Sequence, residues 1–134
     1  MSRRCRSHCP IAFALDIFGD RWTLIVLRDL LLGGKTRYRE FLASEERIAT
    51  NVLAERLSRL ERSGLVRRER ASGGGRQRTY RPTTMALDLL PMLLEISLWS
   101  AKYDPKTAAP PALMRRIRRD RKGFIDTIRQ RLAR

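Results

Sequence analysis

The chain has 134 residues and a formal net charge of +15 at pH 7, since 29 Lys and Arg residues face 14 Asp and Glu residues. A chain of this length can bury the core of one domain and carry a short appendage. Residues 1–103 carry a net charge of +8 and residues 104–134 a net charge of +7, so the charge is not confined to one tail. Such a field attracts polyanions, which include nucleic acids and anionic membrane surfaces, and charge alone does not choose between them.

The sequence predicts neither a secretory signal nor a membrane span. The N-terminal residues MSRRCRSHCP are basic, but no uninterrupted apolar segment follows them. The apolar runs at residues 24–27 and 30–32 are separated by Arg28 and Asp29, and neither is long enough to cross a bilayer. We therefore expect a cytoplasmic, nucleoid-associated protein with no membrane partner. In that compartment two cysteines are not expected to form a stable structural disulfide.

Two helices are predicted in the first part of the chain. Cys9-Pro10 opens a short, largely apolar helix that stops at Gly19, because proline suits a first helical turn. Asp20 caps the next helix, which continues to Gly33. Few positions of this second helix are polar, so it is expected to be the buried centre of the domain.

The next segment predicts a helix-turn-helix. The first helix is short and begins at Thr36, residues 45–47 form the turn, and Ile48 enters the core. The recognition helix covers about residues 50–63, and Thr50 is expected to accept its first free amides. The apolar stripe of this helix consists of Leu53, Leu57, Leu60 and the closing Gly64.

A basic hairpin follows at residues 65–82. Two strand-like runs flank Ser72-Gly73-Gly74-Gly75, which can turn because glycine adopts a positive φ without steric cost. One acid, Glu69, stands among six arginines, which are Arg67, Arg68, Arg70, Arg76, Arg78 and Arg81. A polar-faced helix beside a basic ribbon is typical of a winged helix-turn-helix, in which the helix enters a groove and the ribbon contacts phosphate. The fold is therefore predicted to be mainly α with a small β-hairpin wing, and its partner to be double-stranded DNA.

After the wing, Thr83 caps a long helix that runs from residue 84 to about residue 103. Pro91 should either kink this helix or lie where a missing hydrogen bond is tolerated. The apolar side of the helix consists of Leu87, Leu90, Leu94, Leu98 and Trp99. That is more apolar surface than one small domain can cover, so this helix and residues 12–18 are expected to form a homodimer interface.

The C-terminal part is predicted to be an appendage. Residues 104–111 contain three prolines and form a linker, and residues 112–134 form a basic amphipathic helix that can break at Gly123. We therefore assign residues 9–103 to a DNA-binding and dimerisation domain, and residues 104–134 to the linker and basic helix.

Together these stretches resemble the HxlR-type regulators, a branch of winged-helix transcription factors related to the MarR family. The matching stretches are Cys9-Pro10, Gly19-Asp20-Arg21-Trp22-Thr23, Leu27-Arg28-Asp29-Leu30-Leu31-Leu32-Gly33, Arg37-Tyr38, residues 48–60, Gly64-Leu65-Val66, Tyr80-Arg81-Pro82-Thr83, and residues 87–99 with Pro91. The resemblance covers about residues 5–103 and implies a homodimer, built from the N-terminal and post-wing helices, on a palindromic operator near a promoter. Ala86 stands where the family usually has glycine, and the tail beyond Asp104 has no counterpart in the family's pattern.

The exposed front of the recognition helix holds the residues that we expect to read bases. Asn51 can pair with adenine, Arg59 with guanine, and Glu55 can accept a hydrogen bond from cytosine. On an arbitrary helix these side chains would form a solvated face. Their place after a helix-turn and before a basic wing favours DNA contact instead.

The remaining DNA-binding candidates are Thr50, Val52 and Arg56 on the helix, Arg37 before it, and Arg76 and Arg78 at the wing tip. Val52 can touch a thymine methyl group or belong to the core, and Arg56 can hold a phosphate or pair with a nearby acid. Arg76 and Arg78 are expected to enter a minor groove or contact phosphate. Arg37 precedes a helix that typically crosses the DNA backbone, so it is expected to contact phosphate.

Cys9 is a candidate redox or electrophile sensor. A thiol at a helix N-terminus beside a basic arm is expected to favour the reactive thiolate, which oxidants and electrophiles modify. Some HxlR-type proteins are similar in using a cysteine at this place as a sensor, and the alternative is a cysteine that only packs. Cys5, four residues earlier, can resolve a sulfenate within the subunit or bridge to the partner.

Other functions find less support in the sequence. Cys5, His8 and Cys9 are crowded into five residues without a fourth ligand elsewhere, so no metal site or other cofactor is predicted. No set of nucleophile, base and orienting residue is present, and the protein is not expected to be an enzyme. Two alternatives stay open: a thiol-redox enzyme that uses Cys5 and Cys9, and an architectural protein that binds DNA or RNA without sequence preference.

Overall fold

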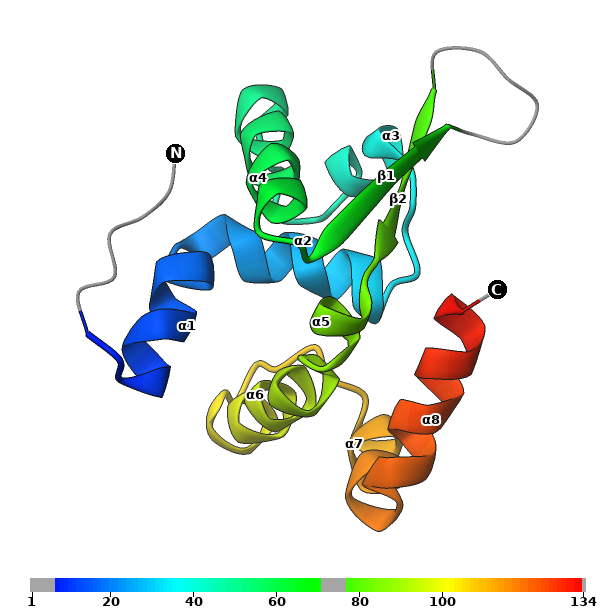
Figure 1. The fold of residues 1–134 in the computed structure, drawn as a ribbon. Helices are drawn as coiled ribbons and strands as arrows, with labels where there is room; N and C mark the ends of the chain where they lie inside the picture. Colours follow the sequence, from blue (N-terminus) through cyan, green and yellow to red (C-terminus); the bar gives the residue numbers. More distant parts are fainter. Residues whose placement is uncertain (1–6, 71–76, 134) are drawn as a thin grey trace.

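The computed structural model describes residues 7–70 and 77–133, and Figure 1 shows their arrangement. The elements in chain order are α1 (Pro10–Phe18), α2 (Arg21–Leu31), α3 (Tyr38–Leu42), α4 (Thr50–Arg62), β1 (Val66–Arg70), β2 (Arg78–Pro82), α5 (Thr84–Leu87), α6 (Leu90–Tyr103), α7 (Pro111–Arg119) and α8 (Arg121–Leu132). The described residues are mainly helical and contain one antiparallel hairpin, which confirms the predicted class. The predicted turn at residues 72–75, Arg76 and Cys5 lie outside the described residues.

The two N-terminal helices begin where the sequence predicts. Pro10 is the first residue of α1, and at the start of α2 the carboxylate of Asp20 accepts a hydrogen bond from the backbone N–H of Trp22 (3.2 Å). Helix α2 lies in the middle of the ribbon in Figure 1. Its fully buried apolar residues are Val26, Leu27, Leu30 and Leu31. The prediction of a buried central helix is therefore confirmed, whereas α1 contains no buried residue.

The first helix of the helix-turn-helix begins at Tyr38, two residues later than predicted. The N–H groups of Thr36 and Arg37 donate to the carboxylate of Glu40 at 3.0 and 2.8 Å. The carbonyl of Thr36 accepts from the N–H of Tyr80 at 2.7 Å, and Arg37 forms an antiparallel bridge with β2. Thr36 and Arg37 are therefore held in extended conformation against the wing, and the prediction that Thr36 starts the helix is wrong.

Helix α4 confirms the predicted apolar stripe but not the predicted cap. Leu53, Leu57 and Leu60 are buried, and so is Ile48 before the helix. Thr50 is the first helical residue, the N-cap is Ala49, and no side chain caps the helix. The prediction that Thr50 accepts the first amides is therefore wrong, because a residue that is already helical points its side chain away from them.

The end of α4 lies where the sequence predicts. Gly64 has a φ of 83°, a conformation that residues with a side chain rarely adopt. Its N–H donates to the carbonyl of Glu61 (3.1 Å), and the N–H of Leu65 donates to the carbonyl of Leu60 (2.9 Å). This pair of bonds satisfies carbonyls that the helix end would leave free, and it turns the chain directly into β1.

The hairpin has a regular antiparallel register. Val66 lies opposite Pro82, Arg68 opposite Tyr80, and Arg70 opposite Arg78. Val66 is buried, and the other four residues of β1 are exposed. The base of the wing is thus fixed in the core, and its basic strands extend away from it (Figure 1).

The long helix predicted after the wing is two helices. Thr83 caps α5 as expected, since its hydroxyl accepts from the N–H of Ala86 (3.4 Å). The helix is interrupted at residues 88–89, and Pro91 lies in the first turn of α6. Proline lacks a backbone N–H, and the first helical turn is the place where that donor has no intrahelical partner. Of the two predicted outcomes for Pro91, the tolerated position is the observed one.

By length and composition alone, the stretch Thr84–Tyr103 is apolar enough to cross a membrane. A core helix of a water-soluble fold meets the same two criteria. Here Leu90, Leu93, Leu94 and Leu98 are buried against the rest of the chain. The prediction of no membrane span rested on the shorter apolar runs at residues 24–27 and 30–32 and did not consider this stretch.

The C-terminal segment forms two helices, and it breaks at Asp120 rather than at Gly123. Asp120 has an extended φ of −147°, and its carboxylate accepts a hydrogen bond from the N–H of Gly123 (3.0 Å). An aspartate that caps a following helix ends the preceding one, whereas a glycine near a helix start is tolerated. Gly123 therefore lies in the first turn of α8, and the prediction of a break there is wrong.

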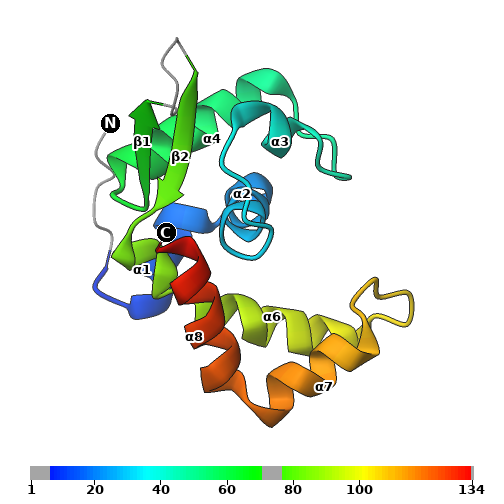
Figure 2. The same ribbon diagram turned by 90° about the vertical axis from the view of Figure 1, so that its right-hand side faces the viewer.

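Helices α7 and α8 pack back onto the domain. Ile128 of α8 belongs to the main hydrophobic core, and Met114 and Ile117 of α7 form a second cluster with Leu94 and Leu98 of α6. In Figure 2, α8 spans the distance between α5, below the wing, and α7 at the opposite end of the molecule. The C-terminal segment is thus packed against the rest of the chain along most of its length.

Candidate nucleic-acid interface

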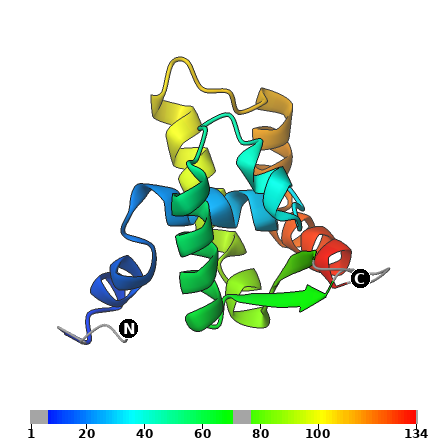
Figure 3. The ribbon, with the colours of Figure 1, turned by 90° about the horizontal axis from the view of Figure 1, so that it is seen from above.

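Helices α3 and α4 and the hairpin lie together at one end of the molecule. Figure 3, seen from that end, shows α4 and the wing side by side with α2 behind them. The N–H of Thr83 donates to the carbonyl of Leu65 (3.1 Å), and its hydroxyl donates to the carbonyl of Gly64 (2.6 Å). These bonds join the end of α4 to the base of the wing, so the two elements have a fixed relative position.

The outer face of α4 carries the predicted base-reading residues. Thr50, Asn51 and Glu55 are exposed. Asn51 makes no side-chain hydrogen bond to any other residue that the structure describes, so its amide is available to a ligand. Val52 is half-buried and packs against the main core, which favours the core alternative for this residue over contact with a thymine methyl group.

Arg56 and Arg59 of α4 form ion pairs with two acids. Nε of Arg56 donates to the carboxylate of Asp20 (2.6 Å), and its other end pairs with Glu55. Arg59 pairs with Glu55 (3.0 Å) and reaches Asp20 at 3.6 Å. Of the two alternatives for Arg56, the structure shows the pair with an acid. Arg59 and Glu55, which were expected to read separate bases, neutralise each other in the free protein.

Asp20 was predicted only as the cap of α2, and the structure also places it in this network. Partial burial raises the pKa of Asp20, but hydrogen bonds from Thr23, Arg56 and the N–H of Trp22 outweigh burial and lower this pKa to about 2. The same pairing raises the pKa of Arg56 against the opposing effect of burial. Asp20 and Arg56 are 36 positions apart, so no local pattern in the sequence reveals the contact.

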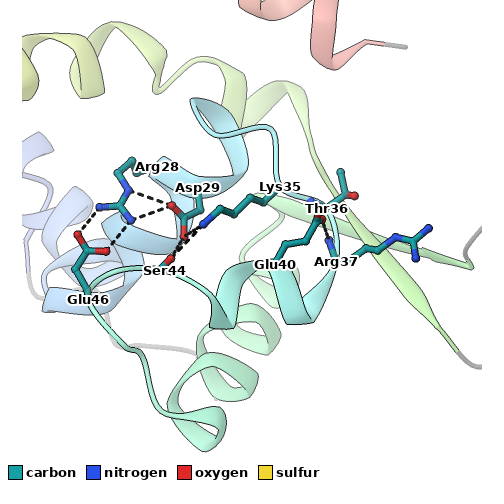
Figure 4. Close-up of polar contacts among 8 residues, drawn as sticks. All are labelled: Arg28, Asp29, Lys35, Thr36, Arg37, Glu40, Ser44 and Glu46. Atoms are coloured by element: carbon teal, nitrogen blue, oxygen red, sulfur yellow. Dashed lines mark hydrogen bonds and ion pairs between the residues drawn. The ribbon is translucent and has the colours of Figure 1, made fainter. Parts of the chain in front are cut away.

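A second polar cluster fixes the turn between α3 and α4 (Figure 4). Asp29, only 5% exposed, accepts hydrogen bonds from Arg28 and from the hydroxyl of Ser44, and pairs with Lys35 at 3.3 Å. Arg28 also donates two hydrogen bonds to Glu46, each of 2.8 Å. Buried acids are stable only when they are paired in this way. An Arg-Asp pair inside a largely apolar helix is the sequence signal that could have predicted the cluster.

The charges of this cluster are strongly coupled. The hydrogen bonds from Arg28 lower the pKa of Glu46 to about 2, against a smaller opposing effect of burial. The same bonds raise the pKa of Arg28 above its ordinary value. The turn at residues 43–49 is therefore attached to α2 by the ion pair between Arg28 and Glu46, which persists at every pH near neutrality. These contacts fix the turn that precedes α4 relative to α2.

A cavity of about 360 Å³ opens between α3 and the wing. Its lining consists of Arg37, Tyr38, Arg39, Gln77, Arg78 and Tyr80. The predicted DNA-binding residues Arg37 and Arg78 are thus brought together here, although they are 41 positions apart in the sequence. Arg37 donates a hydrogen bond to the side-chain oxygen of Gln77 (3.2 Å).

The arginines of the wing differ in how they are paired. Arg67 contacts Glu69 at 3.1 Å, Arg81 contacts Glu69 at 4.0 Å, and Arg68 contacts Glu61 at 3.6 Å. Arg78, in contrast, makes no ion pair with an acid of the described residues. The second wing-tip candidate, Arg76, lies outside the described residues.

Cys9 is the N-cap residue of α1, and its side chain is exposed. Its carbonyl accepts from the N–H of Phe13 (3.0 Å) in the first turn of the helix. Its possible partner Cys5 lies outside the described residues. Within residues 7–70 and 77–133, no three His, Cys, Asp or Glu side chains lie close enough to hold a metal ion.

Two helices present large apolar side chains to solvent. On α1 these are Ile11, Phe13 and Leu15, which are 72, 59 and 55% exposed. On α6 they are Ile96, Trp99 and Tyr103, which are 42, 67 and 61% exposed. Both helices expected at the interface therefore expose apolar side chains, but of the apolar side predicted after the wing only Trp99 is exposed. Leu90, Leu94 and Leu98 are buried within the subunit.

Known proteins are similar to this chain in sequence and in fold. The family described as HxlR-like helix-turn-helix matches residues 17–108. The HTH-type transcriptional regulator YdeP of Bacillus subtilis (strain 168) is 34% identical over 95 residues, which cover 71% of this chain and 73% of YdeP. The structure of PA1607, a candidate transcription factor, has a TM-score of 0.70 at 34% identity and covers 78% of this chain and 73% of that chain.

A regulator of known redox type is also similar. The structure of the redox regulator HypR in its reduced form has a TM-score of 0.63 at 28% identity, covering 72% of this chain and 95% of HypR. HypR in its oxidised form has a TM-score of 0.61 at 30% identity, covering 70% of this chain and 96% of HypR. The neighbours confirm the predicted winged-helix fold, and the chain belongs to the HxlR-like helix-turn-helix family of transcriptional regulators.

Proposed function

We propose that this regulator is a repressor that binds duplex DNA sequence-specifically, as a homodimer on a palindromic operator. The observation that carries the proposal is the geometry of α4, which buries its leucine face and presents Thr50, Asn51 and Glu55 to solvent beside a basic wing. A binder that used charge alone would need no uncharged amide at that place. The proposal places the protein in the cytoplasm, where the operator lies.

Some residues of α4 contact bases in this proposal, and others position the helix. Asn51 is exposed and unengaged, so we assign it direct contact with a base, most simply adenine. Arg59 reaches a guanine when it releases Glu55, which is then free to accept from cytosine. Arg56 stays paired with Asp20 and orients α4 rather than contacting DNA. Thr50 and the wing arginines Arg76 and Arg78 contact the backbone or the minor groove.

The test is the ratio of affinities for a selected and a scrambled duplex. The operator is first selected from a random duplex pool with the full-length protein. Asn51→Ala should then lower the discrimination between the selected and scrambled duplexes by about 1–3 kcal/mol, the usual worth of one base contact. Gln130→Ala, which removes an exposed amide on α8, should change nothing. Equal losses on both duplexes in Asn51→Ala, or equal affinity of the wild type for both, would favour an architectural binder.

The homodimer is supported by the uncovered faces of α1 and α6. Six large apolar side chains on two helices are exposed in the single chain, and a second copy can bury them. A twofold dimer would also set the distance between two α4 helices, which must match half-sites about one DNA turn apart. Sedimentation at micromolar concentration measures the oligomeric state directly.

We further propose that Cys9 responds to an oxidant or electrophile. Its thiol is exposed at the start of α1, next to the apolar side chains that the dimer would bury. The similarity to HypR, which is known in reduced and oxidised forms, supports this proposal. A group added at Cys9 would press on the interface and change the spacing of the two recognition helices.

The experiment for Cys9 compares DNA affinity before and after treatment with diamide, a quinone or an aldehyde. Cys9→Ser should bind the selected operator with unchanged affinity and should lose the response to these compounds. Cys5→Ser should retain a response but yield a different end product, such as a persistent sulfenate. Unaltered DNA binding of the treated wild type would reduce Cys9 to a packing residue.

A further inference from the structure

Arg78, which lines the cavity between α3 and the wing, has a buried donor without an acceptor. Nη1 of Arg78 is inaccessible to solvent, and no acceptor among the described residues lies within hydrogen-bond distance of it. A buried polar group left unpaired costs about 1–3 kcal/mol, and more when the group is charged. Folded proteins rarely retain such a donor unless a ligand satisfies it.

The arginines around this donor also lack ion pairs with acids of the described residues. Arg37, Arg39 and Arg78 line the same cavity, and none of the three pairs with an acid of the described chain. Glu40 of α3 attracts the charge of Arg37, but it makes no ion pair with it, and its carboxylate accepts from the N–H groups of Thr36 and Arg37. Arg37 donates instead to Gln77, a neutral acceptor. Most arginines that α2 and α4 contribute to the site, such as Arg28, Arg56 and Arg59, are neutralised by acids, so the cavity differs from its surroundings.

The walls of the cavity suit a compact anion. Tyr38 and Tyr80 contribute aromatic sides, and the ring of Tyr80 is fixed by an edge contact with Phe41, at 6.2 Å between ring centroids. The hydroxyl of Tyr38 is used, since it donates to the carbonyl of Thr50 (2.7 Å). Guanidinium groups are therefore the main free donors, and they bind phosphate and carboxylate through charge-assisted hydrogen bonds. A volume of about 360 Å³ holds a phosphate group with several waters.

We propose that this cavity is a binding site for a phosphate group, which Arg78 and Arg37 hold together. The site spans two elements, because Arg37 precedes α3 and Arg78 begins β2. A bound phosphate therefore locks the wing to the helix-turn-helix in addition to the backbone bridge between residues 37 and 79. The inference rests on the proposed function for its first source of phosphate, the backbone of the operator; the second source is a free phosphate compound.

One arm of the test concerns the DNA backbone. A single methylphosphonate, which removes one backbone charge, is placed in turn at each position of the selected operator. Wild-type protein should lose about tenfold in affinity at one position of each half-site, as expected for a charge-assisted bond. Arg78→Gln should bind the unmodified operator about tenfold more weakly and be insensitive at that position. Arg81→Gln, a wing variant outside the cavity, should retain the sensitivity.

The other arm uses inorganic phosphate and the protein without DNA. The NMR signals of the Arg37 and Arg78 side chains should shift saturably with phosphate, and not with potassium chloride of equal ionic strength. Arg78→Gln should abolish the shift of Arg37. If Arg78→Gln does not fold, as judged by its circular dichroism, Arg37→Gln replaces it in both arms, and the side-chain signal of Arg78 becomes the readout of phosphate binding.

The outcomes distinguish the operator backbone from a free phosphate compound as the source of phosphate. They also distinguish failure of the phosphate site from failure of the proposed function. A sensitive backbone position that depends on Arg78 identifies the operator as the source of phosphate. Saturable phosphate binding without such a position identifies a site for a free phosphate compound. If neither appears, the cavity is no phosphate site. The proposed function is contradicted separately if the wild type shows no preference for any unmodified duplex. In that case the second arm still tests the cavity.

Discussion

The first and last helices of the described chain are both amphipathic, but only the last is covered. Helix α1 contains no buried residue, and Phe13 is 59% exposed. Helix α8 places Ile128 in the main core at 5% exposure, and Arg131 donates to the carbonyls of Leu31 and Leu32 at 3.4 and 3.3 Å. The apolar face of α8 is thus satisfied within the subunit, whereas the face of α1 is not.

Helix α6 combines both features, because it has one covered face and one exposed face. One of its faces, with Leu94 and Leu98, is covered by Met114 and Ile117 of α7. Another face of α6, with Trp99, is exposed to solvent. The C-terminal helices therefore complete the fold of one chain, whereas the face of α1 is left for the proposed homodimer to cover. This difference predicts that substitutions on the two sides lower different quantities.

The largest effect is expected where the C-terminal helices are covered. Ile117→Ala removes a side chain that is 2% exposed, and should lower the free energy of unfolding by about 2–5 kcal/mol. Urea denaturation at several protein concentrations measures it, and the loss should be the same at each concentration. As a matched control, Ile11→Ala removes a side chain that is 72% exposed, and its loss should depend on protein concentration. Equal concentration dependence in both variants would erase the distinction.

A somewhat smaller effect, on dimerisation, is expected at the exposed face of α6. Trp99→Arg should weaken dimerisation by about 2 kcal/mol or more, because large aromatic residues often dominate an interface. Sedimentation should show monomers, and circular dichroism should show an intact fold. The buried Leu94 is not a suitable site for this test, since an arginine there would unfold the subunit. A Trp99→Arg protein that remains dimeric would remove α6 from the interface.

The contrast between the two ends also separates what the sequence could and could not predict. Local signals located Pro10 in α1, the Asp20 cap and the Gly64 terminator, because each acts on neighbouring backbone groups. The docking of Ile128 could not be predicted, since an amphipathic stripe does not specify which surface covers it. Gly123 was a plausible break, but the capping bond of Asp120 decided the boundary.

The candidate site shows the same limit. Spacing alone placed Asn51, Glu55 and Arg59 on one helix, and the structure adds that Glu55 and Arg59 are paired. The partner of Arg56 is a residue at the joint between α1 and α2, far away in the sequence. The cavity of Arg37 and Arg78 depends on a backbone pairing between the residues before α3 and β2, which no periodicity indicates.

A moderate effect is expected at the ion pair that anchors the N-terminal side, between Asp20 and Arg56. Asn retains the capping ability of Asp, so Asp20→Asn removes the charge alone. It should cost about 1.5–3 kcal/mol at pH 7, the usual contribution of hydrogen bonds to a charged group. Because the folded-state pKa of Asp20 is lowered to about 2, its contribution is complete above pH of about 4 and is lost as the pH falls through about 2.

Denaturation from pH 6 to pH 2 checks this prediction. Wild-type stability should fall more steeply below pH 4 than that of Asp20→Asn, so the two curves should converge at the lowest pH. Glu46, whose pKa is lowered in the same direction, contributes equally to both proteins and cancels in the comparison. Parallel curves would show that Asp20 is not charged and paired in solution.

The smallest effect is expected at the ion pair that anchors the C-terminal side, between Arg129 and Asp88 at 2.7 Å. The Asp88 side chain is 65% exposed, and exposed pairs of this kind are worth less than about 1 kcal/mol. Arg129→Gln should therefore lower stability only slightly, and added salt should remove the difference. Both results would follow if buried apolar contacts, and not charge, hold α8 in place. A loss as large as that of Ile117→Ala would mean that the basic residues of this helix hold it against the domain.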